Sequence, residues 1–205
     1  GNPVIIAGFG RFGQIAARVL RIRHIQFTAL EINPQQVDFV RRFGSKIYYG
    51  DASQFELLRA AGAADAKVFV LAIDDVEASV RTAEVVRSHF PNLTIYARAR
   101  NRYHAHLLME LGVTHIVRET LFSSIELTAR ILGGLGVSER EAKRTLDIFG
   151  RHDQETLQRQ FAVFRDEDKL IQTSREAAAE LETLFEEDTD AVNAHAQDAP
   201  GAETG

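Results

Sequence analysis

Three glycines near the start of the chain have the spacing of a phosphate-binding turn. Gly8, Gly10 and Gly13 form a G-x-G-x-x-G motif directly after the apolar run of residues 4–7 and at the start of a helical pattern. In that context the glycines permit a tight turn, a close approach of the backbone to phosphate, and close helix–strand packing. The N–H groups that open the helix would then face the phosphate. The alternative is a tight turn that happens to be rich in glycine.

Glu31 is the expected partner of the ribose. It ends the second strand-like run, eighteen residues past Gly13, where a carboxylate accepts hydrogen bonds from ribose hydroxyls. Asn33 rather than an arginine follows, so a 2′-phosphate is disfavoured and the ligand is expected to be AMP or NAD(H) rather than NADP. The alternative for Glu31 is a solvated surface carboxylate.

Further polar residues follow the next strand-like runs, where ligands of open α/β sheets bind. Asp51 could contact adenine or ribose, and the alternative is that it merely shapes a turn. Asp75 also follows a strand, and the alternative for it is that it merely caps a helix. Arg98 and Arg100, two apart, should face the same side, where they could neutralise phosphate or remain exposed. The predicted nucleotide site comprises Gly8, Phe9, Gly10, Arg11, Phe12, Gly13, Glu31, Ile32, Asn33, Asp51, Ala52, Ile73, Asp74 and Arg98.

Arg18 lies on the same predicted helix as Arg11 but seven residues further on. That separation is about two turns, or ~10 Å along the axis. Arg11 can therefore reach a phosphate at the helix start, whereas Arg18 would have to serve a different anion site. The alternative for Arg18 is a solvated helix arginine.

No catalytic or metal-binding motif is evident, and we expect no enzyme activity. The chain has no cysteine, none of its tyrosines has a lysine four residues on, and it lacks the H-E-x-x-H, Walker A and G-x-S-x-G motifs. A dehydrogenase would need an acid–base group beside the cofactor. The net charge of −5 also argues against nucleic acid as a partner.

The elements that must position these residues alternate between strand and helix patterns. The fold class we expect is α/β, a Rossmann-like doubly wound parallel sheet of six strands within residues 1–120. Ser53 with Glu56 reads as a capping box for one of the helices. The expected strands are residues 4–7, 26–31, 46–49, 68–73, 93–99 and 113–117.

A helical arm is expected over residues 121–188, followed by a disordered tail over residues 189–205. The arm should contain helices near residues 121–132, 139–165 and 173–187, with one weak strand pattern at 162–164. Its apolar stripe needs a cover, which could be its own domain or, as we favour, a symmetric second copy. The chain has no signal-peptide pattern and no run of ~18 apolar residues, and its start without methionine suggests a fragment of a longer protein.

Several segments together resemble the cytosolic carboxyl-terminal KTN (RCK) domain of Kef-type potassium efflux systems, in particular KefC-like members. The likeness covers about residues 3–165. It rests on residues 4–14, 42–44, 49–52, 61–63, 72–75, 89–91, 97–100 and 118–120.

This resemblance implies a regulatory function. It implies a homodimer that binds AMP or NAD(H) in the Rossmann site and glutathione or its adducts between subunits, and so gates K⁺ efflux coupled to proton entry. It also implies attachment to a membrane domain of the same protein at the cytoplasmic face of the bacterial inner membrane, and some members of the family need an ancillary quinone-reductase-like subunit. The glutathione contacts match Arg18 and Arg118, and the residue that senses the bulk of an adduct matches Phe43.

One position departs from the family pattern. Asp153 aligns with an asparagine that contacts glutathione in the family, and its carboxylate would repel the carboxylates of glutathione. It lies on the apolar stripe, where a carboxylate is costly unless it is paired. The alternatives left open are an NAD-dependent oxidoreductase, a KTN subunit of a Trk or Ktr uptake system, and a nucleotide sensor that has lost its glutathione site.

Overall fold

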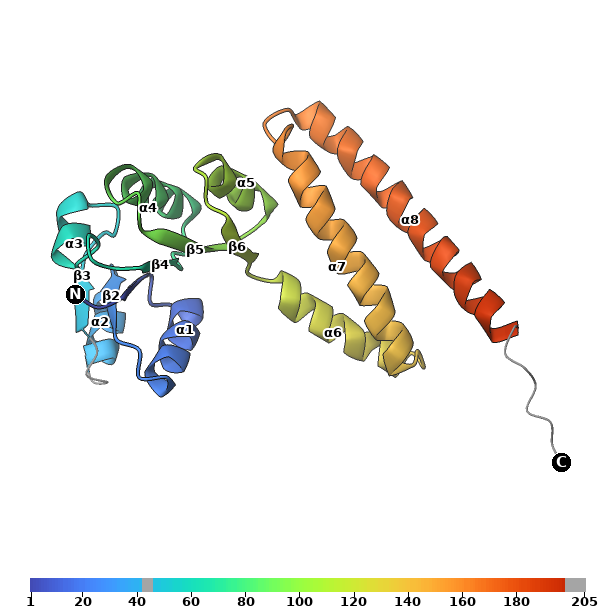
Figure 1. Cartoon of the computed structure of the whole chain (residues 1–205), viewed down its shortest axis with the longest axis horizontal. Helices are drawn as coiled ribbons and strands as arrows, with labels where there is room; N and C mark the ends of the chain where they lie inside the picture. The colour runs from blue at the N-terminus through green and yellow to red at the C-terminus, as the bar shows by residue number, and fades with distance from the viewer. Residues whose placement is uncertain (42–45, 198–205) are drawn as a thin grey trace. The chain divides into compact units, whose positions relative to one another are not determined.

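The computed structural model describes residues 1–41 and 46–197, with the side chains of residues 39 and 195–197 excepted. The chain divides into two compact units, Gly1–Thr120 and Leu121–Gly205 (Figure 1).

The first unit contains a parallel sheet with the strand order of the Rossmann fold. Its six strands in the described residues follow the order β3-β2-β1-β4-β5-β6, and every neighbouring pair is parallel, as predicted. The direction of winding reverses between β1 and β4, and ligands of such sheets bind in the crevice at this point. The strands are β1 Val4–Ala7, β2 Phe27–Glu31, β3 Lys46–Tyr49, β4 Val68–Leu71, β5 Thr94–Ala99 and β6 His115–Arg118.

Helices connect the strands and cover the sheet. Figure 1 shows α1 and α2 on one side of the sheet and α4 and α5 on the other. Right-handed crossovers between parallel strands produce this two-sided arrangement. The helices are α1 Arg11–Ile22, α2 Pro34–Arg41, α3 Phe55–Ala60, α4 Val76–His89 and α5 Arg102–Glu110.

The core explains why the central strands read as continuous apolar runs. Every residue of β1 and of β2 is buried, because both faces of these strands are covered. On the side of α1, Ile6 and Phe9 pack with Ala17 and Phe27. This packing fixes the start of α1 against the end of β1.

The side-chain caps at the helix starts agree only in part with the capping patterns in the sequence. Asp75 caps α4 by accepting the Ala78 N–H at 2.8 Å, and Ser138 caps α7 by accepting the Glu141 N–H at 3.3 Å. The capping box expected at Ser53 is wrong. Gln54 rather than Ser53 precedes α3, and no side chain caps this helix. Both the N–H and the hydroxyl of Ser53 donate to Asp51 Oδ1, which places Ser53 in the turn before the helix.

The second unit consists of helices in its described residues. They are α6 Leu121–Gly134, α7 Glu139–Phe161 and α8 Glu167–Gln197. Residues 162–164 form a turn rather than the strand that their pattern weakly indicated. A polar seam joins α7 to α8: Arg159 forms a two-pronged pair with Glu180 at 2.7 and 3.0 Å, and Arg144 pairs with Asp188 at 3.1 Å.

The last helix is longer than the sequence analysis predicted. α8 continues to Gln197, so the expectation of disorder from residue 189 is wrong for residues 189–197. These residues lack large apolar side chains but are rich in alanine, which favours helix without a core to bury. In the described residues, no helix is long and apolar enough to cross a membrane.

Candidate functional site

The glycine turn has the geometry that each of its three glycines was expected to supply. Gly8 has φ +90, and a Cβ there would lie 2.7 Å from the Ala72 carbonyl, so the turn passes close against β4. A Cβ on Gly13 would lie 2.2 Å from the Gly8 carbonyl oxygen, which shows how closely helix and turn pack. A Cβ on Gly10 would meet no atom within 4 Å, so the backbone there is open to a ligand.

The start of α1 leaves its first N–H groups available. Gly10 precedes the helix in an extended conformation, and no side chain caps it. The first N–H groups of a helix have no partner within the helix, and with the helix dipole they favour an anion. This turn therefore combines open backbone with an uncapped helix start, as a phosphate site requires.

Glu31 is buried rather than solvated, so the surface alternative is wrong. Its side chain is 8% exposed, and its carboxylate accepts the Phe9 N–H at 2.6 Å and the Asn33 N–H at 2.8 Å. Carboxylate bonds to backbone N–H groups are charge-assisted and short. Glu31 thus holds the glycine turn to the loop after β2, while its predicted contact with ribose stays a prediction.

The loops after β2 and β3 carry the next predicted residues. Ile32 is 63% exposed, and Asn33 Oδ1 accepts the Gln35 N–H at 3.0 Å at the start of α2. Asp51 shapes its turn, because its Oδ1 accepts both the N–H and the hydroxyl of Ser53 at 2.8 Å. Ala52 beside it is buried. The turn-forming role considered for Asp51 is therefore confirmed, and a ligand contact remains a prediction.

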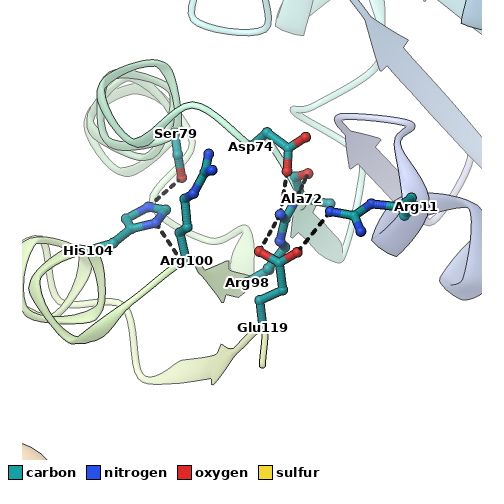
Figure 2. Close-up of polar contacts among 8 residues, drawn as sticks. All are labelled: Arg11, Ala72, Asp74, Ser79, Arg98, Arg100, His104 and Glu119. Atoms are coloured by element: carbon teal, nitrogen blue, oxygen red, sulfur yellow. Dashed lines mark hydrogen bonds and ion pairs between the residues drawn. The ribbon is translucent and has the colours of Figure 1, made fainter. Parts of the chain in front are cut away.

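Arg98 is the centre of an ion-pair network at the carboxyl ends of three neighbouring strands (Figure 2). Its side chain is 4% exposed, so the alternative of an exposed arginine is wrong. Its guanidinium donates to the Ala72 carbonyl at 3.1 Å, to Glu119 Oε2 at 2.6 Å, and to Asp74. The two carboxylates raise the pKa of Arg98 against the opposing effect of burial. Arg98 therefore has fixed carboxylate partners before any phosphate arrives.

Glu119 is a site residue that the sequence analysis did not assign. Its other oxygen, Oε1, pairs with Arg11 at 3.4 Å, and Figure 2 shows the carboxylate between the two arginines. Phe12 lies beside the network, with the Arg98 guanidinium carbon 6.0 Å from its ring centre. Glu119 directly follows β6, which neighbours β5, and that position was the available signal.

His104 is a buried residue that links the end of β5 to α4 next to this network. It is fully buried, its Nδ1 accepts the Arg100 N–H at 3.0 Å, and its Nε2 contacts the Ser79 hydroxyl at 2.9 Å. Burial lowers the pKa of His104 to about 4, with Arg98 adding to the effect. The imidazole is therefore neutral at pH 7 and acts as a structural bridge between β5, α4 and α5.

The residues assigned to glutathione fall in different parts of the chain. Arg18 is exposed on α1, and Arg118 ends β6 half-buried. Asp153 lies in the second unit on α7 and is 7% exposed. Phe43 lies outside the described residues. Their grouping into one binding site stays a prediction.

Comparison with known proteins identifies both parts of the chain. The family model of the TrkA-N domain matches residues 4–119, and that of the potassium efflux system KefB C-terminal domain matches residues 123–200. The Kef carboxyl-terminal domain of Shewanella denitrificans, solved in an AMP-bound form, is 41% identical over 78% of this chain and 98% of its own, with a TM-score of 0.72.

More distant structures share the fold. The TrkA-N domain of the inner membrane protein ybaL from Escherichia coli is 24% identical over 65% of this chain and 96% of its own, with a TM-score of 0.56. The NAD-bound GsuK channel is 21% identical over 62% of this chain and 23% of its own, also with a TM-score of 0.56. The two family models and the Kef match show that the chain belongs to the TrkA-N domain family, among the carboxyl-terminal domains of Kef potassium efflux systems.

Proposed function

We propose that this chain is the ligand-sensing part of a K⁺/H⁺ antiporter and binds AMP or NAD(H) at the glycine turn. The observation that carries the proposal is the open backbone at Gly10 before an uncapped helix, in a domain 41% identical to one solved with AMP. Glu31 is placed beside the same turn, with both of its oxygens close to the backbone that a ribose would approach.

A regulatory function fits the site better than oxidoreductase chemistry. The charged side chains beside the turn form ion pairs with each other, since Arg98 pairs with Asp74 and Glu119. The buried His104 forms hydrogen bonds through both ring nitrogens. Such groups hold a shape rather than exchange protons with a substrate. An oxidoreductase would instead consume NADH with a small substrate, so a turnover assay separates the two.

A homodimer would give the exposed apolar faces a cover. On α1, Ile15, Val19 and Ile22 recur at helical spacing with exposures of 57%, 56% and 76%. No residue of α6 is buried, and Leu127 and Ile131 are 60% and 52% exposed. Symmetric self-association is the commonest way for a chain to bury such faces.

Glutathione or its adducts would bind at that dimer interface. Arg18 is exposed between the apolar residues of α1, where its charge would meet a carboxylate of the peptide. Phe43 would sense the bulk of an adduct, and Arg118 would hold the peptide with Arg18. Asp153 would weaken this binding relative to an asparagine, since it brings a like charge towards the ligand.

The physiological setting follows from the same proposal. The domain would act on a membrane domain of its own protein at the cytoplasmic face of the bacterial inner membrane, with an ancillary quinone-reductase-like subunit in some systems. The match of residues 123–200 to a potassium efflux domain favours this setting over a Trk or Ktr uptake subunit. Ligands would gate efflux by binding one dimer arrangement more tightly than another.

The nucleotide site can be tested with one matched pair of glycine variants. Gly10→Ala adds a methyl group where no protein atom lies within 4 Å, so it should fold normally but lose at least about tenfold in affinity for AMP and NADH. Gly133→Ala on α6 also meets no atom within 4 Å and should keep wild-type binding. Isothermal titration calorimetry measures both. Unchanged affinity in Gly10→Ala, or no affinity in the wild type, would reject the site.

The interface site can be tested by native mass spectrometry. We expect a dimer that binds a glutathione adduct, and Arg18→Gln should reduce the bound fraction. Arg81→Gln is the control, because Arg81 is also an exposed helix arginine but lies on α4, paired with Glu77. A monomer, or equal loss in both variants, would contradict the proposed interface site.

A further inference from the structure

Glu119 holds its two arginine partners with very different strength. Its Oε2 accepts from Arg98 at 2.6 Å, and the Arg98 side chain is 4% exposed. Its Oε1 contacts Arg11 at 3.4 Å, and the Arg11 side chain is 89% exposed. A buried, charge-assisted hydrogen bond is lost at high cost, whereas a long, solvated ion pair contributes little. One half of the carboxylate is therefore fixed and the other half is exchangeable.

The exchangeable partner also lies at the start of the helix that follows the glycine turn. Arg11 is the first residue of α1, directly after Gly10, and Figure 2 shows its guanidinium directed towards Glu119. A phosphate bound at the glycine turn would find Arg11 already paired with an anion. Guanidinium groups bind phosphate and carboxylate through the same donors, so the two anions compete for Arg11.

Glu119 is also well placed to pass this competition along the chain. Its N–H donates to the Ala99 carbonyl at 2.8 Å, which holds it to the end of β5. Thr120 follows, and α6 begins at Leu121. A change at the Glu119 side chain therefore occurs two residues before the first helix of the second unit.

We propose that Glu119 is a built-in competitor of the ligand phosphate. Nucleotide binding exchanges Glu119 for phosphate on Arg11, while the Arg98 bond stays in place, so that occupancy of the site is registered at the start of α6. The proposal rests on the proposed nucleotide site and adds its mode of regulation.

A double-mutant cycle with AMP and adenosine tests the exchange. Glu119→Gln keeps an oxygen for Arg98 but removes the competing charge, so AMP should bind about two- to fivefold more tightly and adenosine should bind as in the wild type. Arg11→Gln should weaken AMP binding, and in that background Glu119→Gln should give no gain. Tyrosine fluorescence in urea verifies that each variant is folded.

The outcomes separate this inference from the proposed function. A wild-type protein without AMP affinity overturns both. Wild-type binding combined with equal or weaker AMP binding in Glu119→Gln, or a gain that persists without Arg11, overturns only the competition. Hydrogen exchange gives the second readout: AMP should change the exchange rate at the Glu119 amide in the wild type but not in Arg11→Gln, and an unchanged rate in the wild type would overturn the link to α6.

Discussion

Replacing the Glu31 carboxylate by an amide should destabilise the first unit measurably. Glu31→Gln keeps the size of the side chain, but its amide has only one oxygen for the two N–H groups, of Phe9 and Asn33, that the carboxylate accepts at 2.6 and 2.8 Å. The other N–H then faces an NH₂ group. A buried donor without an acceptor costs about 1–3 kcal/mol, and the lost bond was charge-assisted. Relief from burying a charge offsets part of this, and we expect a net loss of about 2 kcal/mol.

Urea unfolding followed by tyrosine fluorescence measures this loss in the correct unit. The chain has no tryptophan, and its four tyrosines, Tyr48, Tyr49, Tyr96 and Tyr103, all lie within Gly1–Thr120. The control is Asp75→Asn, the same chemical change at an exposed helix cap, where asparagine caps about as well as aspartate. The midpoint should fall by about 1–2 M urea for Glu31→Gln and hardly at all for Asp75→Asn. Equal midpoints for Glu31→Gln and the wild type would refute the two-bond arrangement.

Acid protonation of His104, a methyl group at Gly13 and loss of the Glu180 charge should each weaken the protein locally. The pKa of His104 is lowered from 6.5 to about 4, so its contribution to stability is complete above pH 6.5 and falls as the pH drops towards 4. By pH 5 the loss should be about 2 kcal/mol in urea unfolding, and a stability that does not change between pH 7 and pH 5 would contradict the buried neutral ring. Gly13→Ala should destabilise the first unit by at least about 2 kcal/mol, since its Cβ would overlap the Gly8 carbonyl oxygen at 2.2 Å; normal stability would show that the turn is looser. Hydrogen bonds from Arg159 and then His152, both on α7, lower the pKa of Glu180 on α8 to about 2. Glu180→Gln should therefore speed hydrogen exchange in α8 at pH 7. Unchanged exchange would mean that the Arg159–Glu180 pair does not hold α8 against α7.

The elements of the first unit could be predicted because local and global signals agree there. Buried parallel strands, a glycine turn and Pro34 after Asn33 each specify one conformation with little competition. The capping box at Ser53 was wrong because Asp51, two residues before it, accepts both the N–H and the hydroxyl of Ser53 and so holds this residue in the turn before the helix. The tail was misread because alanine stabilises helix without the apolar stripe that periodicity detects.

The backbone geometry of the glycine turn was predictable from the sequence, whereas the pairings of the charged side chains near it were not. The motif gives Gly8, Gly10 and Gly13 their roles, since each role depends on backbone geometry alone. Which carboxylate meets Arg98 depends on strand order, because Asp74 follows β4 and Glu119 follows β6, on either side of β5. Strand order places these two carboxylates beside Arg98, but the choice of which side chains at the strand ends form ion pairs depends on rotamers that the sequence pattern does not specify.

The polar seam between α7 and α8 makes the second unit sensitive to dissolved salt. The buried polar residues on the α7 side of this seam are His152, Asp153, Thr156 and Gln160. On α8, Glu180 contacts His152 and Ser174 accepts a hydrogen bond from Gln160. Salt screens attractions between charges, with a screening length of about 8 Å at physiological ionic strength, but it does not weaken hydrophobic contacts. A hairpin closed in this way separates more readily in concentrated than in dilute KCl.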